Sequence, residues 1–235
     1  VDGLRPAAGA VPAAWASRGP GAGGALYSPS INPANNSEYY VACDMSGLYR
    51  TTDFGNSYTT EIFTEIQGGH DAAVRFTSDP AIAYCLSSTG DLAVPMKSMD
   101  GRKTWSPLPG NPLPDDNVYS LWADYAHPGR VIVAGYSELY FSNDGGASFE
   151  PLPASVTGSD GVLVGGAFFD GDAIYLGTSV GLIVSINGGT TFTNAGTPGL
   201  PAGESIFSFA GAKTGGTMRF FCLTGAAGDV YPGLD

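Results

Sequence analysis

One carboxylate lies in a turn whose counterparts elsewhere in the chain differ from it. Asp44 occurs in "YYVACDMSGLYR", which predicts two apolar strands joined by a tight turn. The corresponding turns read "SSTGD", "AGYSE", "GTSVG" and "TGAAG", so Asp44 is not part of a repeated scaffold. Two interpretations remain open: the carboxylate caps its own turn, or it acts as an acid–base group on a bound ligand.

A second candidate for acid–base chemistry is the pair His70 and Asp71 in "GGHDAAVRF". An imidazole beside a carboxylate can transfer protons near neutral pH, although a loop histidine is the simpler interpretation. Asp71 stands at the start of a predicted inner strand and is a second candidate carboxylate. His127, in "YAHPGR", is expected to belong to a Pro-Gly turn of the scaffold.

Aromatic and polar side chains near the predicted inner strands are candidates for sugar binding. The alternative for the aromatic rings is packing between sheets. Arg50 follows the Asp44 turn and is expected either to orient that carboxylate or to pair with another surface charge. The candidate substrate-binding residues are Tyr27, Arg50, His70, Asp71, Trp122 and Tyr136.

A polar stretch that occurs four times indicates the architecture that positions these residues. Each copy follows the pattern Ser/Thr-x-Asp/Asn-x-Gly-x-Ser/Thr-aromatic, except that the second copy has Arg102 where glycine is expected. The third positions are separated by 47, 44 and 43 residues, and such a period is typical of propellers. The third-position residues are Asp53, Asp100, Asp144 and Asn187, and the fifth-position glycines are Gly55, Gly146 and Gly189.

Three short β-rich runs precede each copy and a short strand follows it. The repeat therefore predicts an all-β fold, a β-propeller of four-stranded antiparallel blades that is incomplete in this chain, with four blades and part of a fifth. The polar stretch joins the third strand to the fourth: the Asp side chain accepts backbone N–H groups of its own turn, and glycine allows a positive φ. The expected boundaries are an extended arm over 1–24 and blades over about 25–66, 67–114, 115–157, 158–202 and 203–235.

The composition argues against several classes of partner. The 235 residues carry a net charge of −12 with only 10 Lys and Arg, so we expect binding neither to nucleic acid nor to an anionic membrane. Cys43, Cys85 and Cys222 lack metal-ligand spacing, which predicts no metal site and buried free thiols, with one disulfide left open. "GPGAGG" has the spacing of a dinucleotide-binding loop, but no strand precedes it and no helix follows, so we expect no cofactor.

The four repeated stretches resemble the Asp-box, or bacterial-neuraminidase, repeat. The segment from "GPGAGGALYSPSI" to "TTDFGNSYT" also resembles the N-terminal blade of xyloglucan-active endoglucanases and oligoxyloglucan-releasing hydrolases. In that family a "Y-x-R-T-D-I-G-G" segment carries the catalytic base, and its Asp falls on Asp44. This chain departs from the pattern at Ala42, Cys43, Met45 and Ser46, which replace Arg, Thr, Ile and Gly.

The resemblance implies a glycoside hydrolase that is secreted, extracellular or periplasmic and acts on a β-glucan or xyloglucan-type polysaccharide. Inverting hydrolysis needs two carboxyl groups roughly 6.5–9.5 Å apart, and in the family the acid comes from a second propeller. We therefore expect this chain to need further blades as partners and to be inactive alone. The alternative is a noncatalytic propeller that binds a glycan or a protein; a sialidase or a polysaccharide lyase fits the residues less well.

Overall fold

The computed structural model of the protein describes residues 17, 19–21, 24–45, 47–89, 92–158, 161–197 and 199–226. Most of the expected arm over 1–24 and the last predicted strand, in 229–233, lie outside the described residues. Within them, nearly all regular structure is antiparallel β-sheet. The described residues contain no helix long and apolar enough to cross a membrane.

The described strands form four four-stranded sheets and one two-stranded sheet, which follow one another along the chain. The first sheet contains β1 (Leu26–Ile31), β2 (Tyr39–Cys43), β3 (Gly47–Thr51) and β4 (Thr59–Thr60). The second contains β5 (Arg75–Phe76), β6 (Ala83–Thr89), β7 (Leu92–Ser98) and β8 (Ser106–Pro107). The third contains β9 (Ser120–Ala123), β10 (Val131–Ala134), β11 (Leu139–Ser142) and β12 (Glu150–Pro151).

A one-turn helix, α1 (Ala154–Thr157), leads from the third sheet toward the fourth. The fourth sheet contains β13 (Val164–Asp170), β14 (Ala173–Thr178), β15 (Gly181–Ser185) and β16 (Thr193–Asn194). The fifth sheet is the hairpin of β17 (Glu204–Thr214) and β18 (Thr217–Ala226).

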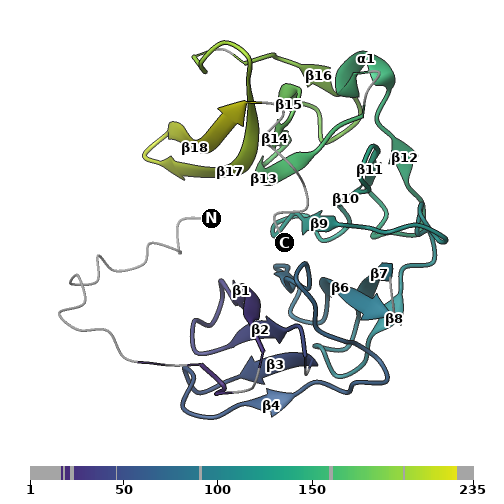
Figure 1. Ribbon diagram of the computed structural model, residues 1–235, viewed down its shortest axis with the longest axis vertical. Coiled ribbons are helices and arrows are strands. Elements are labelled where there is room, and N and C mark those ends of the chain that lie inside the picture. The colour runs from purple at the N-terminus through teal and green to yellow at the C-terminus, as the bar shows by residue number, and fades with distance from the viewer. Residues whose placement is uncertain are drawn as a thin grey trace.

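The sheets stand around a common centre as the blades of a propeller (Figure 1). In each complete sheet the strands are hydrogen-bonded in chain order, and β1, β9, β13 and β17 lie toward the centre while β4, β8, β12 and β16 lie outside. The expectation of an incomplete propeller with four blades and part of a fifth is therefore confirmed.

The hydrophobic core lies between neighbouring blades. One cluster joins Tyr40 and Leu48 of the first blade to Phe76 and Trp105 of the second. Two further clusters join the second blade to the third and the third to the fourth. Because the blades bury both faces, Cys43 and Cys85 are buried, whereas Cys222, which was also expected to be buried, is half-buried. None of the three forms a disulfide in this structure.

The repeated polar stretch forms the turn between the third and fourth strands of each complete blade. Asp53 Oδ1 accepts the backbone N–H groups of Asn56 at 3.0 Å and Ser57 at 2.9 Å, and Oδ2 accepts the Ser57 hydroxyl at 2.6 Å. The N–H of Gly55 donates to the Thr51 hydroxyl at 2.9 Å, and Gly55 has a φ of 79°. These bonds give the third position a structural role in the turn.

The fourth copy of this turn is built around an amide in place of a carboxylate. Asn187 Oδ1 accepts the N–H of Thr191 at 2.9 Å, and Asn187 Nδ2 donates to the Thr191 hydroxyl at the same distance. In the second copy Arg102 adopts a φ of 69° at the position where the other copies have glycine.

Candidate functional site

Asp44 lies in the turn between β2 and β3, at the end of the first blade opposite its polar turn. The antiparallel pairing of Leu26 with Cys43 places this turn beside the start of β1. There Asp44 Oδ1 accepts the N–H of Ala25 at 3.0 Å and the Sγ–H of Cys43 at 3.8 Å. The side chain is exposed, and Oδ2 has no hydrogen-bond partner among the described residues. One oxygen is thus held in place on a side chain that is exposed.

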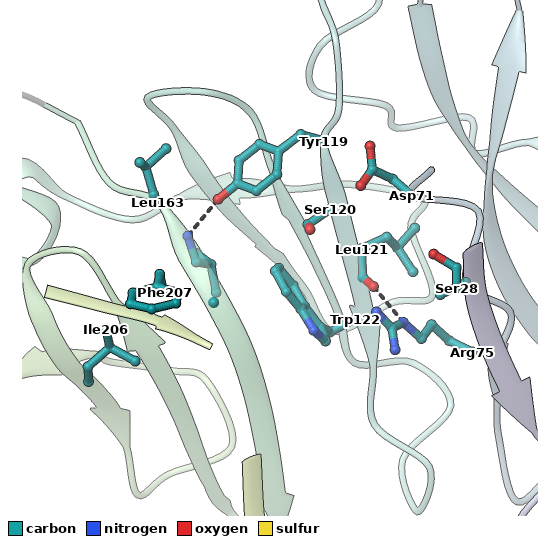
Figure 2. Close-up of a pocket in the computed structure, with 13 residues that line it drawn as sticks. Ser28, Asp71, Arg75, Tyr119, Ser120, Leu121, Trp122, Leu163, Ile206 and Phe207 are labelled. Atoms are coloured by element: carbon teal, nitrogen blue, oxygen red, sulfur yellow. Dashed lines mark hydrogen bonds between the residues drawn. The ribbon is translucent and has the colours of Figure 1, made fainter. Parts of the chain in front are cut away.

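A cavity of about 320 Å³ occupies the centre of the propeller, and we refer to it as the channel cavity (Figure 2). The inner strands of successive blades, or the segments leading into them, contribute to its wall. Representatives of the five blades are Ser28, Arg75, Trp122, Val164 and Phe207. Asp44 does not line this cavity, whereas Asp71 does.

Asp71 reaches the channel cavity from the segment just before β5. Its side chain remains open to water in the cavity, but burial by the surrounding protein raises the pKa of this carboxyl group, and the charge of the neighbouring His70 opposes that rise. His70 is exposed and its ring packs on Tyr27, with 4.2 Å between the centroids. The hydroxyl of Ser28 donates to the His70 carbonyl. This carboxyl group therefore takes up a proton more readily than an ordinary aspartate.

Tyr119 lies near Asp71 in the cavity wall (Figure 2), and Tyr136 packs on Tyr119. Tyr119 is 8% exposed, and its hydroxyl accepts the N–H of Val164 at 2.5 Å, which ties the third blade to the fourth. Burial raises the pKa of Tyr119 to about 12. Tyr136, from the turn between β10 and β11, is 48% exposed and packs on Tyr119 with 5.5 Å between ring centroids. Tyr136 therefore offers an exposed aromatic face next to the cavity.

Arg75 and Trp122 lie together in another part of the cavity wall (Figure 2). Arg75 Nε donates to the carbonyl of Leu121 at 2.8 Å, and the guanidinium carbon lies 6.0 Å from the centroid of the Trp122 ring. The second and third blades are thereby connected through one cation and one indole.

The structure separates one candidate from the rest. Arg50 binds Glu38 with 2.6 Å between Nη2 and Oε1, near the end of the blade away from Asp44, so its partner is Glu38. The other predicted binding residues gather around the channel cavity or lie next to its wall, and they are Tyr27, His70, Asp71, Trp122 and Tyr136.

Arg75 and Tyr119 line the cavity, although neither is among the binding residues predicted from the sequence. A signal for Arg75 was present, because it is the charged residue inside the predicted inner run "AAVRFTS". Nothing in the sequence distinguishes Tyr119 from the tyrosines that only pack. Among the described residues, no group of three or more His, Cys, Asp or Glu is placed to hold a metal ion.

No family model matches this chain, and no curated protein sequence matches it. Solved structures do share its fold. A GH74 enzyme from Niastella koreensis superposes with a TM-score of 0.58 at 21% identity, over 85% of this chain and 28% of that one. The GH74 xyloglucanase from Xanthomonas campestris gives a TM-score of 0.57 at 20% identity, over 80% of this chain and 32% of that one.

A third similar structure is YCF48 from Cyanidioschyzon merolae, with a TM-score of 0.51 at 14% identity over 79% of this chain and 59% of that one. The chain spans about a third or less of the length of the two GH74 enzymes. At these identities the likeness is one of fold, the β-propeller.

Proposed function

We propose that this chain is part of a secreted carbohydrate-active β-propeller protein, in which Asp44 is the general base for hydrolysis of a β-glucan or xyloglucan-type polysaccharide. The observation that carries the proposal is that the Asp44 carboxylate is both held in place and exposed. Oδ1 is fixed by the N–H of Ala25 at 3.0 Å, while the side chain is exposed to solvent. A carboxylate held in this way can accept a proton from water through its second oxygen.

The proposed reaction needs a second carboxyl group that protonates the oxygen of the leaving sugar. In an inverting mechanism the two groups lie roughly 6.5–9.5 Å apart, which leaves room for the attacking water. Asp71 has the chemistry of such an acid, because burial raises its pKa. A raised pKa keeps a carboxyl group protonated up to a higher pH. The other source of the acid is a further part of the protein, and in that case the chain alone binds polysaccharide without cleaving it.

Polysaccharide would lie across the loops that carry Asp44 and the mouth of the channel cavity. Tyr136 and the stacked pair of Tyr27 and His70 would supply aromatic contacts there. The likeness in fold to a GH74 xyloglucanase supports this choice of substrate class.

The experiment compares the natural full-length protein with its Asp44→Asn and Asp71→Asn variants, on xyloglucan and on other β-glucans. Asp44→Asn is expected to slow release of reducing ends by about 10²- to 10⁴-fold while polysaccharide binding is retained. If Asp71 is the acid, Asp71→Asn also lowers the rate, and a substrate with a good leaving group restores part of it, because such a group needs no protonation. Unchanged turnover in Asp44→Asn would remove Asp44 from the mechanism.

A noncatalytic glycan-binding propeller is the second candidate, and one observation favours it. The bond between Asp44 and Ala25 alone explains a carboxylate in this turn, and Asp44 lies outside the channel cavity. Binding of xyloglucan oligosaccharides without any product, by the full-length protein as well as by this chain, would select this function over hydrolysis.

A further inference from the structure

Arg75 differs from three other arginines of the blades. Arg50 and Arg102 both bind Glu38, and Arg130 binds Asp124. Arg75 forms no ion pair with any described residue, and its hydrogen bond within the described part of the chain runs from Nε to the carbonyl of Leu121. The two Nη atoms, which are the ends of the guanidinium, thus have no protein acceptor among the described residues.

Apart from the Leu121 carbonyl and the Trp122 ring, no described residue is placed to balance the charge of Arg75. Arg75 is partly buried in the wall of the channel cavity, and burial lowers its pKa. Charges taken out of water are normally paired with an opposite charge. The chain has 22 Asp and Glu, yet the acidic side chain in the same cavity, Asp71, does not pair with Arg75.

The rest of the cavity wall shows what kind of anion would fit. Figure 2 places Asp71 near Tyr119 and Arg75 near Trp122, with Ser28 on the wall between them. One part of the cavity is therefore cationic, and another part offers the hydroxyl of Ser28 and the carboxyl group of Asp71. Phe207 adds an apolar side chain to the wall of the cavity. A volume of about 320 Å³ is at the lower limit of ordinary ligand sites and suits one sugar-sized ring.

We infer that the channel cavity binds a small sugar acid, whose carboxylate pairs with the free Nη atoms of Arg75 and whose hydroxyl groups face Ser28 and Asp71. Arginine presents two parallel N–H donors, which matches the geometry of a carboxylate. The site is distinct from Asp44 and does not depend on hydrolysis at that residue.

Isothermal titration calorimetry of the full chain with D-glucuronate, and with D-glucose as its neutral counterpart, tests this inference. Glucuronate is expected to bind on the order of tenfold more tightly than glucose, since one charge-assisted pair distinguishes them. Arg75→Met is expected to remove that preference. The matched control is Lys103→Met, which removes one positive charge from an exposed polar turn and is expected to leave the preference intact.

Equal affinity for the two sugars in the unmodified chain would overturn the inference, as would an Arg75→Met chain that folds and keeps the preference for glucuronate. If Arg75→Met fails to fold, the Arg75→Lys variant tests the role of the guanidinium instead. Lysine retains the charge but not the two parallel donors, so glucuronate binding is expected to weaken several-fold while glucose binding is unchanged. Sodium acetate is expected to displace glucuronate from the unmodified chain, and failure to compete would also contradict the site.

Discussion

Arg102 of the second blade binds Glu38 of the first, with 3.2 Å between Nη2 and Oε1. Glu38 also accepts hydrogen bonds from Arg50 and from Asn32, both at 2.6 Å. Burial works to raise the pKa of Glu38, but these bonds and the two positive charges hold it below its ordinary value. Arg102 also lies over the ring of Phe76, 5.3 Å from its centroid. The arginine that replaces glycine in the second polar turn thus forms a contact between blades.

Replacing Arg102 by methionine is expected to lower the free energy of unfolding by about 2 kcal/mol. Removing one partner of a buried pair costs about 3–5 kcal/mol when the other charge is left alone, but here Arg50 still neutralises Glu38. Urea unfolding followed by circular dichroism measures the change. The neighbouring Lys103→Met variant serves as control, because Lys103 is exposed, and an equal loss in both variants would contradict a specific role for the contact.

The polar turns are expected to make the fold sensitive to acid. Hydrogen bonds within each turn lower the pKa of Asp53, Asp100 and Asp144 from 3.8 to about 2. A folded-state pKa below the unfolded one gives stabilisation that is complete above about pH 4 and is lost as the pH falls toward 2. The urea midpoint, measured from pH 5 to pH 2, should decline across this window.

Changing all three residues to asparagine should flatten that decline. The amide side chain of Asn187 already makes the corresponding turn in the fourth blade, so asparagine is compatible with the structure. The variant loses the charge that titrates between pH 4 and pH 2. A decline as steep as that of the unmodified chain would show that other groups cause the acid sensitivity.

The fourth and fifth blades approach each other closely at Gly166. A Cβ atom built there would lie 2.1 Å from the carbonyl oxygen of Phe209 in β17. Gly166→Ala is therefore expected to push two backbones apart and to cost about 3 kcal/mol of stability, measured by urea unfolding. Gly171→Ala is the comparison: it has open space but a φ of 62°, and we expect it to cost about 1 kcal/mol. Equal losses would contradict a steric cause at Gly166.

The architecture could be predicted from the sequence because its signal is local and repeated. The polar turns place a hairpin at a fixed point in each blade, and the hydrogen bonds around Asp53 join residues only two to four positions apart. The alternation of apolar runs and turn residues then supplies the remaining strands.

The site was harder to predict because it depends on contacts between distant parts of the chain. Asp44 is fixed by Ala25, 19 residues away, and Tyr119 by Val164, 45 residues away. Which residues of an inner strand face the channel depends on the packing of the blades, and β5 has only two residues from which to judge its register. Arg50 illustrates the limit, since its nearness to Asp44 in sequence does not place it beside Asp44.

The rate of xyloglucan hydrolysis by the natural full-length protein, with Asp44 intact and with Asp44→Asn, tests the central claim most directly. The account predicts hydrolysis by the unmodified protein and a fall in kcat of about 10²- to 10⁴-fold in the variant, with KM little changed, because loss of a general base affects the chemical step. An unchanged kcat in a folded Asp44→Asn protein would contradict it, and so would the absence of hydrolysis of any β-glucan by the unmodified protein.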